Sequence, residues 1–390
     1  MAYEGFLDAV DRIGGEPITA RMERRAPIRH LDPALLATTL LLSVFGAVMV
    51  HSTTTTGPGS LFSDPSAFAS RHIAYLFAGA MVLLAVSFLD YGVLARLSPF
   101  IYVLTIAALV LVLLIGDTQS GATRWISLGA FQAQPSELAK IAVLIAMAAF
   151  IAARKGEVRG IDVGICVVLV AIPSGLIYLQ PDLGTMMVFV ALLGGCLLIG
   201  GARLRHFAVL AVGALAVVTL VLQAGMLKDY QVQRLTSFLD PNPDVRSVGY
   251  NLTQSKFAIG SGGIGGKGLG DENTQTRLDF VPEQHTDFIF TAVGEQLGFI
   301  GSATLLGLLG LLLWRGIRIA TMSRDLFGAL LAAGIVSLWS FQIFVNVGMT
   351  MGIMPITGIP LPFISFGGSS LITNYVCVAV LLNIHMRRFL

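Results

Sequence analysis

Charged side chains are scarce in this chain of 390 residues: Asp, Glu, Lys and Arg make up only 12% of it, whereas hydrophobic residues make up 55%. A typical soluble domain is about 25% charged and about 45–50% apolar. This composition therefore excludes an ordinary water-soluble domain, and we expect no nucleic-acid partner. The formal net charge of +2 says little, because the placement of the charges matters more than their sum.

Cysteine and histidine are also sparse. Cys166, Cys196 and Cys377 all lie in apolar runs, and three small buried thiols favour packing over a disulfide or metal role. The six histidines are scattered, and no pair has the spacing of zinc ligands. We therefore assign no protein-held metal and expect no organic cofactor.

The first 30 residues contain five arginines but lack the apolar core and cleavage site of a signal peptide. We expect residues 1–30 to form a short cytoplasmic N-terminal arm, with the first apolar run as its own insertion signal. The remainder, 31–390, is predicted to be a single transmembrane domain.

Long apolar runs dominate the rest of the chain. A spanning helix needs about 20 mostly apolar residues, and ten runs approach or meet this length. The predicted fold is an all-α polytopic membrane protein of about ten transmembrane helices, with one long extracytoplasmic loop, about 227–286, between the seventh and eighth. The spans are expected at about 34–51, 72–89, 98–116, 136–153, 161–179, 183–200, 206–226, 287–314, 325–349 and 370–386.

Basic residues gather in alternate loops, and an excess of Lys and Arg marks the cytoplasmic side. We therefore predict that both termini are cytoplasmic and that the long loop faces the exterior. No nucleotide pool exists outside the cell. An enzyme site on this loop would therefore draw the energy for bond formation from a substrate that is already activated. The short outer loops carry only Arg71 and Arg124, while the inner segments hold Arg96, Arg154, Lys155, Arg159, Arg203, Arg205, Arg315, Arg318, Arg324, Arg387 and Arg388.

The glycine-rich segment 260–268 contains the letters of a dinucleotide fingerprint, but it follows no strand of a βαβ unit. A P-loop is also excluded, because Ser261 and Gly268 stand where that motif needs Gly and Ser or Thr. Two interpretations stay open. The segment forms flexible turns, or its amides form a nest for a phosphate beside Lys256 or Lys267.

Two carboxylates and a lysine stand near the outer ends of the fourth and sixth spans. Glu137 and Lys140 are three residues apart and share one helix face. Asp182 begins the sixth span at a similar depth. Lys140 is half of a structural ion pair, with Asp182 or Glu137, or a cationic site for a lipid-linked phosphate, and the two roles are compatible.

Asp287 stands where the long loop meets the eighth span, and ionisable groups at that depth are functional candidates. An aspartate at a helix start also commonly caps the helix, so a catalytic base and a cap are both open. We expect His285 to be a supporting hydrogen-bond partner, because no Ser or Cys accompanies it as a nucleophile. The Pro- and Gly-broken loop 351–370 predicts a cavity wall or a lipid groove.

Taken together, these motifs resemble the SEDS family of cell-wall polymerases, and its elongation branch more closely than its division branch. The resemblance covers nearly the whole chain, from about His30. The residues that carry it are Arg124-Trp125, Gln134-Pro135-Ser136-Glu137 with Lys140, Gln180-Pro181-Asp182-Leu183-Gly184-Thr185, Gln254-Ser255-Lys256, Ala258-Ile259-Gly260-Ser261-Gly262-Gly263, Pro282-Glu283, His285-Thr286-Asp287-Phe288-Ile289-Phe290, Pro360-Leu361-Pro362 and Gly367-Gly368-Ser369.

The resemblance implies a ten-span protein of the bacterial inner membrane that polymerises lipid II into glycan strands and releases undecaprenyl pyrophosphate during elongation and cell-shape maintenance. It implies a class B penicillin-binding protein as the transpeptidase partner, together with other elongation-complex membrane proteins. It places the family's essential aspartate at Asp287. Phe366 stands where the family often has Tyr, and segment 268–275 is longer and more acidic than usual.

Such a polymerase needs one base and several cations in a single inverting displacement. We assign Asp287 as the base and take Arg124, Lys140 and Lys256 as candidate phosphate contacts, with a divalent Mg or Mn ion as a further candidate. Two other functions stay open. A lipid II flippase or transporter would also use intramembrane charge and broken loops, and a scaffold of the elongation complex would need no chemistry.

Overall fold

The computed structural model describes residues 30–54, 65–119, 122–128, 131–155, 157–225, 248–271, 274–275 and 284–388. The predicted N-terminal arm lies almost wholly outside the described residues. So do much of the predicted long loop and its Pro282-Glu283 pair.

The described helices match the ten predicted spans. Nine of them are long and apolar enough to cross a membrane, and the tenth, α8, is apolar and has 17 residues. The chain is therefore a multi-pass membrane protein, and the predicted fold class is confirmed. The ten helices are α3 (Pro33–Thr54), α4 (Pro65–Phe88), α5 (Tyr91–Ile115), α6 (Pro135–Ala153), α7 (Gly160–Leu179), α8 (Leu183–Ile199), α9 (Leu204–Gln223), α12 (Ile289–Thr321), α13 (Leu326–Met351) and α14 (Gly368–Arg387).

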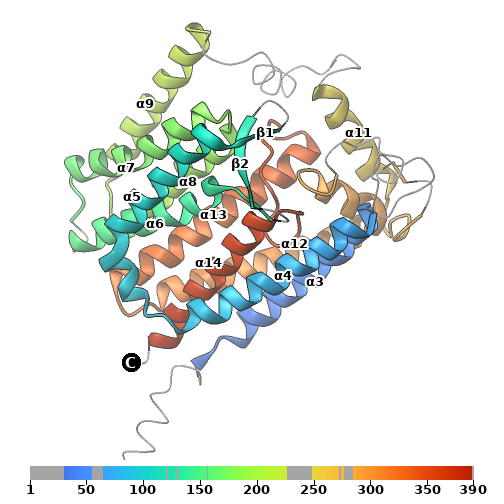
Figure 1. The fold of residues 1–390 in the computed structure, drawn as a ribbon, viewed down its shortest axis with the longest axis horizontal. Coiled ribbons are helices and arrows are strands. Elements are labelled where there is room, and N and C mark those ends of the chain that lie inside the picture. The colour runs from blue at the N-terminus through green and yellow to red at the C-terminus, as the bar shows by residue number, and fades with distance from the viewer. Residues whose placement is uncertain are drawn as a thin grey trace, which may run out of the picture.

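The bundle has two distinct ends. Helix α3 begins and α14 ends at the same end, which we call the inner end (Figure 1). The opposite, outer end contains the starts of α12 and α14 and the short helix α11 (Val248–Ser261).

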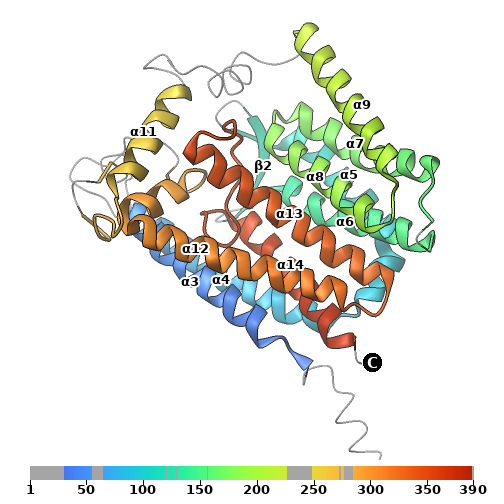
Figure 2. The ribbon, with the colours of Figure 1, turned by 180° about the vertical axis from the view of Figure 1, so that it is seen from behind.

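Burial divides the helices into a centre and a periphery. Most of the apolar stretches of α6, α13 and α14 are buried, so these helices form the centre of the bundle. Helix α9 stands off from its neighbours in both views (Figures 1 and 2), and none of its residues is buried by the described part of the chain.

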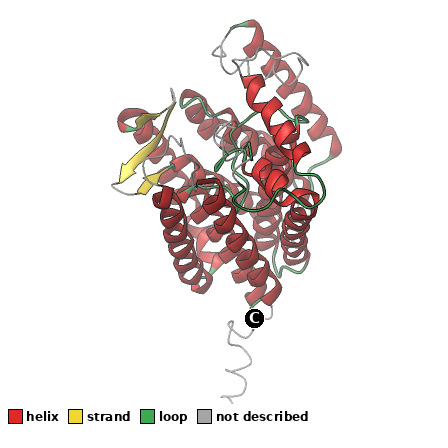
Figure 3. Ribbon diagram, turned by 90° about the vertical axis from the view of Figure 1, so that its right-hand side faces the viewer, coloured by secondary structure: helices red, strands yellow, loops and turns green. Residues whose placement is uncertain are grey.

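A small antiparallel sheet, which the sequence did not predict, joins α5 to α6. It contains β1 (Asp117–Gln119), β2 (Ala122–Leu128) and β3 (Phe131–Ala133), with β2 in the middle. The sheet lies at the edge of the helical bundle (Figure 3). It leads directly into α6, so it fixes where that helix begins.

Helix α11 lies inside the predicted long loop and was also not predicted. Ser255 anchors it to the bundle, because its hydroxyl lies 2.6 Å from the Thr291 hydroxyl and donates to the Thr350 carbonyl at 2.8 Å. This part of the loop is therefore docked on α12 and α13.

The glycine-rich segment after α11 packs against a break in α12. Gly298 has a φ of 64° and a non-helical ψ of −157°, which interrupts the helix. The amides of Lys267 and Gly268 donate to the carbonyls of Glu295 and Gln296, at 3.0 and 2.9 Å. These two amides therefore bind protein carbonyls, and a phosphate nest in the rest of the segment stays a prediction. Two of the glycines allow this close approach: a Cβ on Gly262 would lie 2.0 Å from the Gly294 carbonyl oxygen, and one on Gly266 would lie 2.2 Å from the Gln296 carbonyl oxygen.

Candidate functional site

Asp287 lies in a turn at the outer end, just before α12, and its side chain is half-buried. The N-cap residue of α12 is Phe288, and no side-chain hydrogen bond caps that helix. Asp287 is therefore not the N-cap of α12. Its backbone is held from α13, because the buried Asn346 side chain donates to the Asp287 carbonyl at 2.9 Å.

The loop between α13 and α14, residues 352–367, is connected to this turn once through Asn346 and once directly. The second hydrogen bond of Asn346 goes to the Ile359 carbonyl at 2.8 Å. The Phe366 amide donates to the His285 carbonyl at 2.9 Å. The loop therefore fixes the backbone on which Asp287 stands.

The same loop reaches the starts of α8 and α6. A Cβ on Gly184, in the first turn of α8, would lie 2.7 Å from the Thr357 carbonyl oxygen, so only glycine allows this approach. Just beyond the loop, the Ser369 hydroxyl accepts from the Gln134 amide at 2.9 Å and donates to the Gln132 carbonyl at 3.0 Å. Three motifs that are far apart in the sequence therefore meet at segment 352–369.

Glu137 and Lys140 form an ion pair on α6, with Nζ 2.7 Å from Oε1. Their side chains are only 4% and 2% exposed. The predicted shared helix face is confirmed. Glu137 Oε2 and the neighbouring Ser136 hydroxyl are buried and have no hydrogen-bond partner among the residues described. An ammonium has three donors, and the only hydrogen bond of Lys140 within this part of the chain goes to Glu137. The pair therefore keeps capacity for a ligand.

Asp182 caps a helix and does not pair with Lys140. Its carboxylate is the N-cap of α8 and accepts from the Thr185 amide at 3.2 Å and the Thr185 hydroxyl at 2.9 Å. The ion pair of Lys140 is therefore with Glu137 and not with Asp182.

Arg124 extends from β2 to the turn between α7 and α8. Its guanidinium donates to the carbonyls of Gln180, at 3.1 Å, and Pro181. It thereby ties the sheet to the segment that precedes Asp182, and its role as a phosphate contact stays a prediction.

Lys256 and His285 contact different residues of this outer region. Lys256 is exposed on α11, and a Cβ on Gly352, at the end of α13, would lie 2.5 Å from its ammonium nitrogen. A cation there complements the carboxyl end of α13. The His285 ring packs edge-on against Phe68, with ring centroids 5.2 Å apart, and lies 5.8 Å from the Phe366 ring. Phe366 occupies the place where a tyrosine was expected.

Next to this region, an apolar cavity of about 260 Å³ lies between α5, α6 and α14. Its wall includes Gln134 and Pro135, at the start of α6, and Ser369. The cavity therefore adjoins the hydrogen bonds that connect the loop to α6. The other lining residues are Leu104, Thr105, Ala108, Ala133, Leu138 and Ile372.

Two polar residues of this region were missed in the sequence. Asn346 holds the Asp287 backbone, and Glu295 is fully buried in α12, where it accepts from Lys267 at 2.8 Å and from the Gln275 amide at 2.6 Å. Both lie inside apolar spans. The rarity of such groups in membrane helices was the signal that could have found them.

A family model described as a cell cycle protein family, with FtsW, RodA and SpoVE as its members, matches residues 33–389. Among similar proteins, a probable peptidoglycan glycosyltransferase FtsW of Shewanella sediminis is 41% identical over 374 residues, which cover 94% of this chain and 90% of that protein. The peptidoglycan glycosyltransferase MrdB of Escherichia coli K12 is 38% identical, covering 92% and 94%. Stage V sporulation protein E of Bacillus subtilis is also 38% identical, covering 90% and 96%.

Solved structures are similar over the same extent. A chain from a peptidoglycan synthase complex, described as coordinating polymerization and crosslinking, aligns with a TM-score of 0.76 and 31% identity over 92% of this chain and 98% of that one. The rod-shape-determining protein RodA of Thermus thermophilus aligns with a TM-score of 0.69 and 29% identity, over 92% and 98%.

Proposed function

Because this chain belongs to the family of FtsW, RodA and SpoVE, we propose that it is a peptidoglycan glycosyltransferase that polymerises lipid II, with Asp287 as the catalytic base. One observation carries the site assignment. The turn that holds Asp287 and the helix that holds the Glu137–Lys140 pair both connect to segment 352–369. The loop thereby places a half-buried carboxylate and a buried cation in one outer region of the bundle.

The reaction proposed is a single displacement at the anomeric carbon of the donor sugar. The 4-hydroxyl oxygen of the acceptor forms the new bond, and the bond from that carbon to the pyrophosphate oxygen breaks. The proton passes to the Asp287 carboxylate, and undecaprenyl pyrophosphate leaves with the bonding electrons. A donor in the α configuration gives a β-linked glycan. A positioned general base contributes about 10²–10⁴-fold to such a step.

Lys140 is the proposed electrostatic partner of the departing pyrophosphate. Its Nζ lies 2.7 Å from Glu137 Oε1, and its remaining donors match phosphate oxygens. Arg124 and Lys256 stay candidates for a second contact. The described residues hold no group of three or more His, Cys, Asp or Glu placed to bind a metal ion. A divalent Mg or Mn ion stays a candidate contact for the pyrophosphate oxygens.

The substrate lipid needs an apolar surface beside the reacting sugars. The cavity next to Gln134 and Ser369 offers one, because its lining is almost entirely apolar. We place part of the undecaprenyl chain there, with its pyrophosphate toward the polar outer region.

The proposed setting is the bacterial inner membrane, with both termini cytoplasmic and the site facing the periplasm. The basic inner loops support this orientation. The synthase complex among the similar structures supports a crosslinking partner, for which a class B penicillin-binding protein is the proposal. Identity to MrdB and to FtsW differs by only three points, 38% against 41%. The elongation role is therefore tested separately, by rescue of rod shape in cells depleted of their own elongation polymerase.

The test of the base is polymerisation of purified lipid II by Asp287→Asn and Asp287→Ala protein with the partner present. We expect a loss of at least about 100-fold for both variants. Asp271→Asn is the matched control, because Asp271 lies in the same outer segment, and it should keep activity near the wild-type level. If Asp287→Asn protein with an unchanged melting temperature still polymerises at the wild-type rate, the assignment is wrong.

Lipid II movement in reconstituted vesicles distinguishes the transporter. Translocation without polymer formation by the wild-type protein would overturn the glycosyltransferase proposal. Polymer formed without net translocation would support it.

A further inference from the structure

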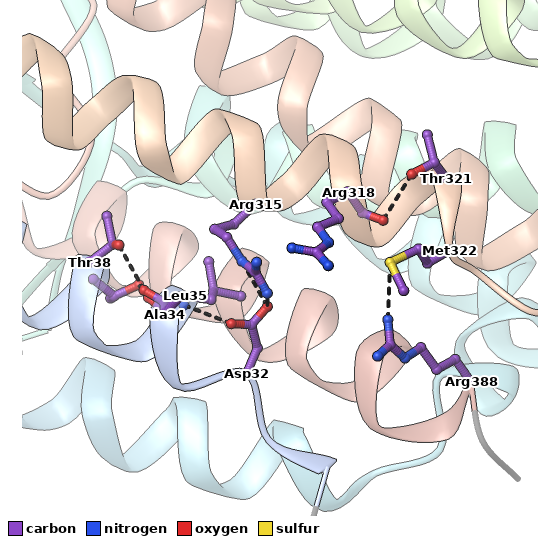
Figure 4. A network of polar contacts seen from close by, with 10 residues as sticks. Asp32, Ala34, Leu35, Thr38, Arg315, Arg318, Thr321, Met322 and Arg388 are labelled. Carbon is purple, nitrogen blue, oxygen red and sulfur yellow. Dashed lines mark hydrogen bonds and ion pairs between the residues drawn. The ribbon is translucent and has the colours of Figure 1, made fainter.

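A second polar cluster lies at the inner end, far along the helices from Asp287. Arg315 and Arg318 come from α12, while His385 and Arg388 come from α14 and its C-cap. One carboxylate, Asp32, faces them from the residue before α3. Figure 4 shows Arg318 between the other two arginines. With His385 neutral, the cluster carries three positive charges against one negative charge.

Asp32 is fully committed to Arg315. It is completely buried and accepts from Arg315 Nε at 3.0 Å, from Arg315 Nη2 and from the Leu35 amide at 3.0 Å. Two other carboxylates at the inner end are also engaged. Asp90 lies 3.6 Å from Arg387, and Asp325 accepts from Tyr91 and from the Gly328 amide.

Arg318 therefore has no acidic partner within the residues described. Its guanidinium makes no ion pair there and lies over the Trp314 ring, 5.8 Å from its centroid (Figure 4 shows a dashed line only at its backbone carbonyl). Nη1 of Arg388 contacts the sulfur of Met322 at 3.1 Å. Burial and the neighbouring charge of Arg318 lower the pKa of Arg388. Among the residues described, Arg318 therefore adds a positive charge that no carboxylate pairs, and Arg388 lies close enough to feel it.

Trp314 indicates what lies outside this cluster. Its ring is 52% exposed on a membrane helix, one helical turn before Arg318. Exposed tryptophans on spanning helices favour the headgroup level of a bilayer, where the ring meets lipid and water at once. Guanidiniums at that level face the phosphates of lipid headgroups, and guanidinium and phosphate form strong charge-assisted hydrogen bonds.

We propose that Arg318 and Arg388 bind the phosphate of an anionic phospholipid in the inner leaflet, with Trp314 against its glycerol and upper acyl chain. Basic pockets between membrane helices are suited to such headgroups. The site is independent of the polymerase proposal, because it needs only a membrane at the inner end.

The test is binding of phosphatidylglycerol and of phosphatidylcholine to the purified full-length protein in detergent, followed by native mass spectrometry. The wild type should prefer phosphatidylglycerol. Arg318→Gln with Arg388→Gln should weaken that binding about 10-fold and leave phosphatidylcholine binding unchanged. The single variant Arg318→Lys keeps the charge and should remain within about 3-fold of the wild type.

The matched control is Arg96→Gln with Arg205→Gln, which removes the same charge from two other exposed arginines of the inner segments. It should change phosphatidylglycerol binding less than about 2-fold. The proposal is overturned if the control loses as much binding as the double variant, or if the double variant binds normally. Competition by inorganic phosphate at equal concentration would also overturn it, because the ligand would then be the free anion. Unchanged melting temperatures establish that both double variants are folded.

Discussion

The ion pairs at the two ends of the bundle are both buried, but they differ in how many hydrogen-bond partners their carboxylate oxygens have. Asp32 at the inner end accepts hydrogen bonds from Arg315 and from the Leu35 amide, so its oxygens are occupied. Glu137 at the outer end accepts one bond from Lys140, and its second oxygen has no partner in the described part of the chain. A saturated pair joins helices, here α3 to α12. An unsaturated pair costs stability by itself and is useful only where a ligand completes it.

Neutralising both members of each pair gives the largest expected effect. Glu137→Gln with Lys140→Met should lower lipid II polymerisation at least about 100-fold, because the developing charge on the pyrophosphate loses its cation. Asp32→Asn with Arg315→Met is the matched control at the inner end. It should leave the activity of each folded molecule within about 2-fold of the wild type.

Equal losses from the two double variants would remove the functional distinction between the pairs. Activity has to be divided by the folded fraction, which size-exclusion chromatography and thermal unfolding provide.

Removing one partner of the saturated pair should mainly affect stability. Asp32→Asn leaves Arg315 largely buried, at 11% exposure, without its carboxylate. We expect the free energy of unfolding to fall by about 3 kcal/mol. Thermal unfolding in detergent measures this change, and adding Arg315→Met should recover much of it. If the double variant were less stable than Asp32→Asn, the unpaired charge of Arg315 would not be the cause of the loss.

At the outer end, the break in α12 at Gly298 also contributes to stability through the backbone. Gly298→Ala should destabilise the protein by about 1–3 kcal/mol, because the position requires a positive φ. The new Cβ would also lie 2.3 Å from the Gly266 amide nitrogen. Gly307→Ala is the control on the same helix, since no atom lies within 4 Å of a Cβ there. Thermal unfolding should separate the two, and equal melting temperatures would show that the break is not needed.

The smallest expected effect is the pH dependence of the inner pair. Burial alone would raise the pKa of Asp32, but hydrogen bonds from Arg315 and the Leu35 amide, with the charge of Arg315, hold it below its ordinary value of 3.8. A carboxyl of this kind stabilises the fold above its unfolded pKa and loses that contribution as the pH falls through the folded pKa. The stability difference between the wild type and Asp32→Asn should therefore be complete near neutral pH and shrink below about pH 4. If this stability difference grew as the pH fell, the pKa of Asp32 would be raised in the folded protein and not lowered.

Much of the fold could be predicted from the sequence, because a membrane helix is determined by the length and apolarity of one continuous run. All ten spans were located this way. Strands β1–β3 could not be, since their seven-residue centre, Ala122–Leu128, needs partners on both sides before it is stable. Helix α11 was missed for a related reason: docking through Ser255 holds a segment that is only mildly apolar.

The site was predictable in part. Periodicity on one helix brought Glu137 and Lys140 together correctly, because residues three apart face the same way. Asn346 and Glu295 were missed, since their roles depend on contacts with Asp287 and Lys267 from distant segments. The choice of Glu137 over Asp182 as the partner of Lys140 likewise depended on Asp182 capping α8, which is a local competition that spacing does not resolve.

The exposure of helix α9 affects how freely its sequence can vary. None of its residues is fully buried by the rest of the described chain. Phe207 and Leu210, near its start, pack against the core, so neighbours select the shape of few side chains along it. Its sequence is constrained by lipid solubility and by the thickness that it must cross. Mutations that exchange one aliphatic residue for another can therefore accumulate there freely, and homologues should diverge most in this helix while keeping its length.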